Sequence, residues 1–447
     1  MNTYSPFHKP IAEIETSDLA ALRLVSEGWY VEYKREVPRA ALIAKSVSAF
    51  ANQFGGWLFY GIAEAADGGR TAGSFPGISA VEAAASEPLV RDAVRGGMNP
   101  AAYFETRILR GPCVDIGLPA DRAVLVVRIP EGPNTPYVHG SGRIYRRIAD
   151  ASDPREATDR HTLDTLFERS RERRQRLVRF LKTSVELSED EGEQPYASIF
   201  LLPDPLGDRG IASRATFKEF AELMQQPPPI GTAGLVFDNI FTSARGFVAR
   251  QVGTNDPHHK VLTWEYHLDG SSVVTLPLRR GLPSGPRLYA QQSQFMEICH
   301  PSQLSRVLDI NVLLNVIAAC IATHWKLSRA FGVPLQVWAK LRLENVWRLV
   351  PFLDTSGFSS FTQRFGIPTV QQSEVLVPPG TSFEELLPLD ARSGTDDELS
   401  ALAPALTVAN ELFYALGLPI SMVATDPKEF LEAGARGGEV AGGRWNQ

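Results

Sequence analysis

The first third of the chain alternates short apolar runs with one amphipathic segment. Residues 29–34 (WYVEYK) predict a strand, and the helical spacing of apolar residues over 42–54 predicts an amphipathic helix that ends at a pair of glycines. Residues 57–64 are apolar on both faces and predict a central strand. Three further stretches predict strands: Ala101–Arg110, Ala123–Pro130 and Gly142–Ile148. The pattern predicts an α+β fold with a mixed sheet and packed helices.

The chain becomes helical and strongly basic from His161, and an acidic stretch with a proline over 188–195 predicts a linker. Beyond it, alternating runs predict antiparallel strands, with a tight hairpin at Asp269-Gly270 and helices at Ser305–Phe331 and Glu398–Leu416. The predicted parts are an N-terminal extension (1–16), a first domain (17–155), a basic helix and linker (156–190), a second α+β domain with antiparallel strands that senses a trigger or binds a partner (191–435), and a flexible tail (436–447).

The net charge of −6 over 447 residues excludes a protein that coats nucleic acid with its whole surface, because that mode needs a broadly positive field. The charge is uneven, however. The first 180 residues are about neutral to slightly positive, and the remainder carries the negative excess. Any contact with nucleic acid is therefore expected in the first part of the chain.

The cysteines and the apolar stretches favour a cytoplasmic protein. The three cysteines form no CxxC pair, which fits a reducing compartment. The N-terminus shows no secretory signal. The most apolar stretch, residues 310–325, is interrupted by asparagines and is shorter than the roughly 18 residues of a membrane span, so we expect a core helix and no membrane domain.

Three acids and a lysine form the most informative constellation: Glu27, Glu32, Lys34 and Glu64. Glu32 and Lys34 point the same way because side chains alternate along a strand, and Gly28 allows the bend that would bring Glu27 beside them. Carboxylates that converge are typical ligands of Mg²⁺ or Mn²⁺, which would activate water while Lys34 holds a phosphate. A plain ion pair between Glu32 and Lys34 explains the same spacing, and both interpretations stay open at this point.

The run from about Leu19 to Asp153 resembles the Schlafen AlbA_2 family. In that family an acid five positions before an E-[FY]-K triplet leads into [SA]-AFAN-x-x-GG-x-L-x-x-GI. The matching residues here are Glu27, Glu32-Tyr33-Lys34, Ser48–Gly56 and Gly61-Ile62, and the family's later block is matched by Val126–Gly132, Pro136-Tyr137 and Ile144–Ile148.

The resemblance implies a domain that handles nucleic acid. Nuclease-active Schlafen proteins cleave RNA such as tRNA with a divalent metal and three acids, which here would be Glu27, Glu32 and Glu64, with Lys34 as a further catalytic residue. The third acid of those nucleases is usually Asp, so Asp67 competes with Glu64. Animal Schlafens pair two such lobes into a clamp; one copy is visible here, so a clamp would require a homodimer. No P-loop motif is present, and we expect no ATP site.

A nucleic-acid surface is predicted at Lys34, Arg143, Tyr145 and Arg147, where arginines on one strand face would hold phosphates and Tyr145 would stack on a base. Two functions remain open. One is a metal-dependent endoribonuclease acting on structured RNA such as tRNA in stress or anti-phage defence. The other is a non-catalytic protein, for example a transcriptional regulator that binds DNA, in which the same acids are structural.

Overall fold

The computed structural model describes residues 4–7, 9–65, 70–148, 153–183, 192, 194–207, 211–226, 235–252, 261–278, 280–283, 289–390 and 399–441. Two compact units divide the chain: residues 1–176 with 206–210, and residues 177–205 with 211–447. The division falls inside the basic helix α3 (Arg160–Lys182). Both units combine helices with sheets, so the predicted α+β class is confirmed.

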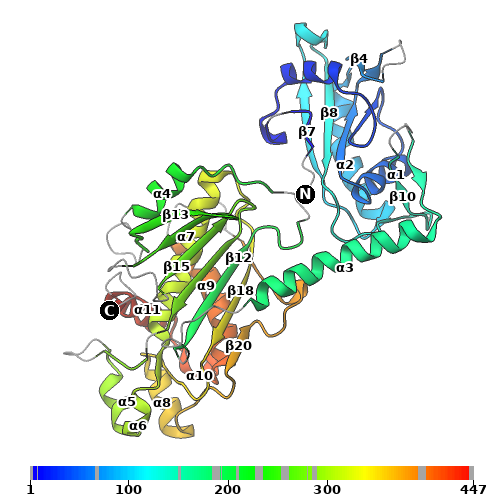
Figure 1. Ribbon diagram of the computed structural model, residues 1–447. Coiled ribbons are helices and arrows are strands. Elements are labelled where there is room, and N and C mark those ends of the chain that lie inside the picture. Colours follow the sequence, from blue (N-terminus) through cyan, green and yellow to red (C-terminus); the bar gives the residue numbers. More distant parts are fainter. Residues whose placement is uncertain are drawn as a thin grey trace. The chain divides into compact units, whose positions relative to one another are not determined.

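The first unit is built on a five-stranded mixed sheet with the order β1-β2-β8-β5, in which β7 also pairs with β8. Strands β1 and β2 are parallel and are connected by α1, whereas the other pairs are antiparallel. Helices α1 and α2 cover one face of this sheet (Figure 1). The elements are β1 (Val31–Lys34), α1 (Ala40–Ala51), β2 (Gly56–Tyr60), β5 (Ile78–Ser79), α2 (Ala80–Gly97), β7 (Glu105–Arg110) and β8 (Arg122–Ile129).

The opposite face of the sheet is covered by the short 3₁₀ segments η1 (Ile11–Glu13) and η2 (Thr16–Leu24). Phe7, Ile11 and Ile14 are buried there against strand residues such as Trp57 and Phe59. The described part of the predicted N-terminal extension therefore packs into the hydrophobic core of the first unit. Smaller elements complete this unit: β3 (Ala63–Glu64), β4 (Ala72–Ser74), β6 (Met98–Asn99), η3 (Val114–Ile116), β9 (Val138–His139), β10 (Tyr145–Arg146) and β11 (Arg155–Glu156).

Two predicted strands differ from the structure. The predicted strand 57–64 ends at Tyr60, because Gly61 takes a φ of 99° and turns the chain off the sheet into the β3–β4 hairpin. The predicted strand 142–148 is reduced to Tyr145 and Arg146, which pair with β11. In addition, the hydrophobic pattern did not predict α2, which contains Pro88 and ends in two glycines.

The second unit is built on an eight-stranded antiparallel sheet with the order β13-β14-β15-β16-β12-β18-β20, in which β21 also pairs with β18. The strands are β12 (Tyr196–Leu202), β13 (Asn239–Ser243), β14 (Gly246–Arg250), β15 (Thr263–His267), β16 (Ser272–Pro277), β18 (Val337–Glu344), β20 (Glu374–Val377) and β21 (Leu387–Leu389). The predicted hairpin at Asp269-Gly270 joins β15 to β16, with Gly270 at a φ of 82°.

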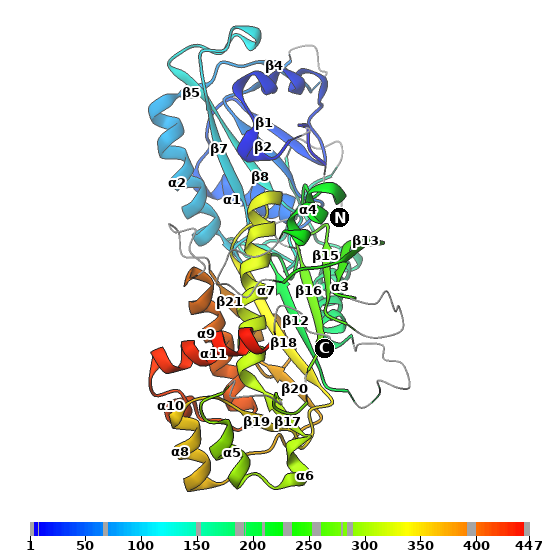
Figure 2. The same cartoon turned by 90° about the vertical axis from the view of Figure 1, so that its left-hand side faces the viewer.

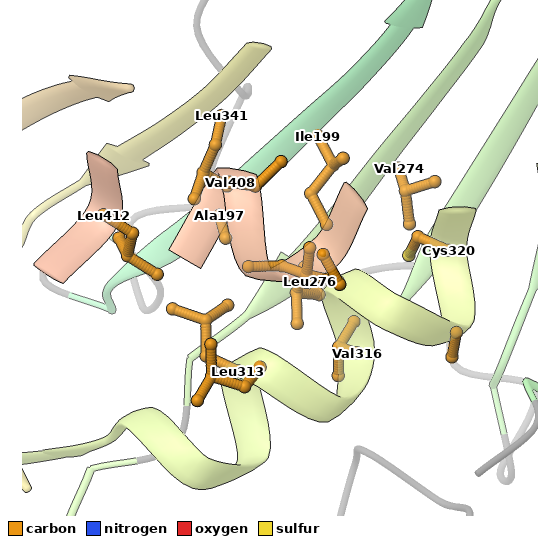
Figure 3. Close-up of a cluster of buried hydrophobic side chains, with 14 of the residues drawn as sticks. Ala197, Ile199, Val274, Leu276, Leu313, Val316, Cys320, Leu341, Val408 and Leu412 are labelled. Atoms are coloured by element: carbon orange, nitrogen blue, oxygen red, sulfur yellow. The ribbon is translucent and has the colours of Figure 1, made fainter. Parts of the chain in front are cut away.

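Helices α7 (Ile310–Phe331) and α9 (Leu399–Ala415) pack on one face of this sheet and form the main core (Figures 2 and 3). Helix α7 is long and apolar enough to cross a membrane, but 72% of its most apolar stretch is buried inside the protein, as in a core helix. The remaining elements are α4 (Phe217–Gln225), α5 (Gln292–Ile298), α6 (Pro301–Leu304), β17 (Val307–Asp309), β19 (Val350–Phe352), α8 (Ser356–Phe365), η5 (Phe383–Glu385), α10 (Ile420–Val423) and α11 (Pro427–Ala441).

The predicted flexible tail is wrong for residues 436–441, which belong to α11; residues 442–447 lie outside the described residues. Arg436 pairs with the buried Asp354 at 2.6 Å. Gly437 lies so close to α7 that an added Cβ would be 2.4 Å from the backbone carbonyl of Asn311. The glycine-rich composition here serves a close approach of two helices rather than chain flexibility.

We predict opposite effects from two glycine substitutions in α11. Gly437→Ala should lower the free energy of unfolding of the second unit by about 1–3 kcal/mol, because its methyl group collides with backbone atoms of α7. Gly434→Ala is the matched control. It meets nothing within 4 Å and should raise stability by about 0.5–1 kcal/mol through helix propensity. Urea unfolding of both variants checks this, and equal effects would contradict the close contact.

Candidate functional site

The candidate site lies around the edge strand β1, which pairs on one side with β2. The chain before β1 bends back at Gly28, whose N–H donates to the carbonyl of Val31 at 3.0 Å. This bend places Glu27 next to Tyr33, whose backbone N–H donates to Glu27 Oε1 at 2.9 Å. The bend predicted at Gly28 is therefore present, and Glu27 fills an edge position that a neighbouring strand would otherwise occupy.

Glu27 is buried but incompletely bonded. Its Oε2 atom has no hydrogen-bond partner among the residues that the structure describes. The pKa of Glu27 is raised to about 7, mainly by burial and also by the charges of Glu64 and Glu32, against the opposing effects of the Tyr33 N–H and Lys34. Glu27 is thus close enough to both other predicted acids to feel their charges, and it accepts a proton near neutral pH.

Glu32 has the opposite environment. Its side chain is 1% exposed, and its Oε2 accepts from the guanidinium of Arg147 at 2.7 Å. Oε1 accepts from the hydroxyl of Ser46 at 3.1 Å and lies 3.2 Å from Lys34 Nζ. The side chains of Glu32 and Lys34 do share one side of the strand, as the period-two argument predicted. Charged and polar partners therefore already surround Glu32.

Lys34 and Glu64 are the accessible members of the site. The side chain of Lys34 is 34% exposed. Burial lowers the pKa of Lys34, but the charges of Glu32 and Glu27 outweigh this effect and hold it above its ordinary value. Glu64 is exposed on β3, beyond the turn at Gly61. Asp67, the alternative third acid, lies outside the described residues.

Not all residues of the predicted nucleic-acid surface are exposed. Arg147 is a correction: its side chain is fully buried and pairs with Glu32, so it does not share an exposed face with Arg143 and Tyr145. The reason is that the strand ends at Arg146, so Arg147 does not continue the alternation of side chains that placed it beside Arg143 and Tyr145. Arg143 remains on the surface, 3.5 Å from Glu156, and the ring of Tyr145 lies 5.2 Å from Lys45 Nζ. Lys45 and Ser46, on α1, were not singled out by their sequence pattern.

Among the described residues, no three His, Cys, Asp or Glu side chains are grouped as ligands for one metal ion. Two of the predicted ligands nevertheless fit a cation. The Glu27 oxygen that lacks a partner in the described part of the chain and the nearby carboxylate of Glu64 offer hard oxygen ligands. Mg²⁺ is often held by one or two carboxylates together with water and substrate phosphates. Glu32, whose oxygens already have three partners, fits less well.

We predict that Glu32→Gln destabilises the first unit by about 3–5 kcal/mol, because it leaves the buried Arg147 guanidinium without its counter-charge. Thermal and urea unfolding of the variant would measure the loss. A variant as stable as the wild type would contradict the burial of this ion pair.

Glu27→Gln should have the opposite effect, and its size should depend on pH. A folded-state pKa of about 7 against an ordinary value of 4.5 means that the folded protein holds a proton that the unfolded chain has released. Stability from this group is therefore present below pH 4.5 and is lost as pH rises through 7. As the pH rises from 5 to 8, the free energy of unfolding of the variant should increase by about 2 kcal/mol relative to that of the wild type. A stability difference that does not change with pH would contradict the raised pKa.

Comparisons with known proteins agree with the first unit's motifs. The family model described as Schlafen, AlbA_2 matches residues 27–156, and this match suggests a function related to nucleic acid. No curated protein matches the chain. A solved structure, the DIP2311 protein from Corynebacterium diphtheriae, is 19% identical over 29% of this chain and 22% of its own length, and its TM-score of 0.19 adds no structural argument. The first unit contains a Schlafen AlbA_2 domain, as its sequence motifs predicted.

Proposed function

We propose that the protein is a divalent-metal-dependent endoribonuclease that acts on structured RNA such as tRNA. The observation that carries the proposal is a buried oxygen of Glu27 that has no partner among the described residues and lies near the charges of Glu64 and Lys34. Glu27 and Glu64 would hold Mg²⁺ or Mn²⁺, which supplies an activated water and neutralises charge on the scissile phosphate. Stress or anti-phage defence in the cytoplasm is the setting that we propose.

The chain's own residues have distinct tasks in this proposal. Lys34 remains protonated at neutral pH and binds a phosphate oxygen of the RNA. Glu32 holds the ammonium group of Lys34 in position from 3.2 Å, and the neighbouring strand β2 fixes the backbone of both residues. Arg143 and Tyr145 extend the contact surface, with Arg143 for phosphates and Tyr145 for a base.

A second function, non-catalytic binding of nucleic acid, is favoured by a specific observation. The partners of Glu32 satisfy it without a metal, and the described residues contain no three-ligand group. In that case Lys34 and Arg143 bind RNA or DNA, and the acids shape the fold. The C-terminal unit then serves to sense a trigger or bind a partner, in a regulator rather than an enzyme. A homodimer would supply the second lobe of a clamp in either case.

Cleavage of total tRNA by the full chain in Mn²⁺ tests the first function. We expect Glu27→Gln and Glu64→Gln each to reduce cleavage by orders of magnitude while RNA binding persists, since each removes one cation ligand. Glu82→Gln, an exposed glutamate on α2, is the matched control and should cleave like the wild type. Cleavage that survives both substitutions or a chelator would refute the metal-dependent enzyme, and retained binding without any cleavage would favour the second function.

Binding of RNA should weaken with salt, because it depends on phosphate contacts. Lys34→Ala and Arg143→Ala should each lower the slope of log affinity against log salt by about 0.7 to 0.9, the value for one lost contact. Arg91→Ala, which removes a surface ion pair on α2, is the control and should leave the slope unchanged. Fluorescence anisotropy at several salt concentrations would measure these slopes, and unchanged slopes for the two site variants would remove this surface from consideration.

A further inference from the structure

Arg147 is the most completely buried charged side chain near the candidate site. Its guanidinium is 0% exposed, and it donates to Glu32 Oε2 at 2.7 Å. Nε and Nη2 of the same group donate to the carbonyl of Gly28 at 3.2 and 2.8 Å. The guanidinium also lies over the ring of Phe50, 4.9 Å from its centroid. One side chain therefore contacts both acidic segments, Glu32 directly and Glu27 through the residue that follows it.

The contacts of Arg147 make the two buried acids unequal. A carboxylate offers about four lone-pair directions, and Glu32 uses three of them on Arg147, Ser46 and Lys34. Glu27 has one backbone donor on Oε1 and none on Oε2 within the described chain. An incoming cation thus meets an open oxygen at Glu27, whereas at Glu32 it would have to approach a guanidinium of its own sign.

We propose that Arg147 is a resident counter-cation that withholds Glu32 from metal ions and thereby sets the affinity of the site for a divalent cation. The inference rests on the proposed metal site and assigns its regulation to a residue that touches neither metal nor substrate. Once Glu27 is ionised, as a ligand of a bound cation would be, three carboxylates face two cations, Lys34 and Arg147, and the site carries one net negative charge. Loss of the Arg147 charge doubles this charge and frees an oxygen of Glu32.

This role and a purely structural role predict changes of opposite sign. If Arg147 only held the acids in place, any substitution would disorder them and weaken metal binding. If Arg147 is a counter-cation, a neutral residue of similar hydrogen-bonding ability strengthens metal binding, because repulsion of the incoming cation has been removed. Arg147 is then a positioning residue whose charge, rather than its bulk, determines the affinity.

Mn²⁺ binding to the full chain, measured as the loss of the free-ion signal in electron paramagnetic resonance, distinguishes the two roles. Arg147→Gln keeps donors for Gly28 and Glu32 but loses the charge, and we expect at least about tenfold tighter binding. Arg147→Lys keeps the charge, and its affinity should stay within about threefold of the wild type. Adding Glu27→Gln to Arg147→Gln should abolish the binding. Weaker binding in the Gln variant, or equal changes in the Gln and Lys variants, would overturn the proposal.

A double variant guards against misfolding of Arg147→Gln. Glu32→Gln with Arg147→Gln removes both charges of the buried pair, so that neither is left without its partner, and keeps the net charge of the site; Mn²⁺ affinity should therefore stay close to that of the wild type. A loss of tenfold or more would mean that Glu32 is itself a ligand, and would refute the inference. Absence of Mn²⁺ binding in the wild type alone would refute the proposed metal site. Absence from both the wild type and Arg147→Gln would refute this inference as well.

Discussion

The buried ion pair between Glu32 and Arg147 is the interaction on which the rest of the candidate site depends. Its two charges are removed from water, at a cost that their attraction offsets only because the remaining donors and lone pairs also find partners. Removing either partner would leave an uncompensated charge in the core. The pair joins residues 115 positions apart and so fixes the chain after β10 against the edge of β1.

The same pair explains why two glutamates five positions apart have such different properties. Glu32 lies on the α1 side of β1, where the guanidinium, a serine and a lysine surround it. Glu27 lies at the strand edge, where burial and the charges of two other acids oppose its ionisation. Pairs of acids held in contrasting environments are typical of sites in which one acid is protonated and the other is ionised, so that the two have different chemical roles. The environment of Glu27 lowers the stability of the folded protein, and such a loss of stability is common at functional sites.

The sequence correctly predicted those features of the site that are determined by residues close to one another in the chain. The period of two along β1 placed Glu32 and Lys34 together, and the glycine after Glu27 correctly indicated the bend. Arg147 was wrongly predicted to be exposed because its partner is remote in sequence. The motif IYRRI resembles an exposed strand, and no residue near it indicates a buried ion pair with Glu32. The same limitation applies to α2, whose apolar residues are mostly alanines with little periodic contrast, and to Gly437, whose neighbour is a helix more than 100 positions earlier.

Several residues of the family motif support the ion pair between Glu32 and Arg147. From α1, Ser46 bonds Glu32, Phe50 lies under Arg147, and Asn52 binds the backbone of both Tyr137 and Tyr145, which holds the segment leading to Arg147. Gly56 then leaves room for the ring of Phe50, since an added Cβ would lie 2.4 Å from it. Phe50, Asn52 and Gly56 of the AFAN and GG motifs therefore help to position the guanidinium. In the function that we propose, contact with the metal and the RNA falls instead to Glu27, Glu64 and Lys34, which do not contact the guanidinium in the described structure.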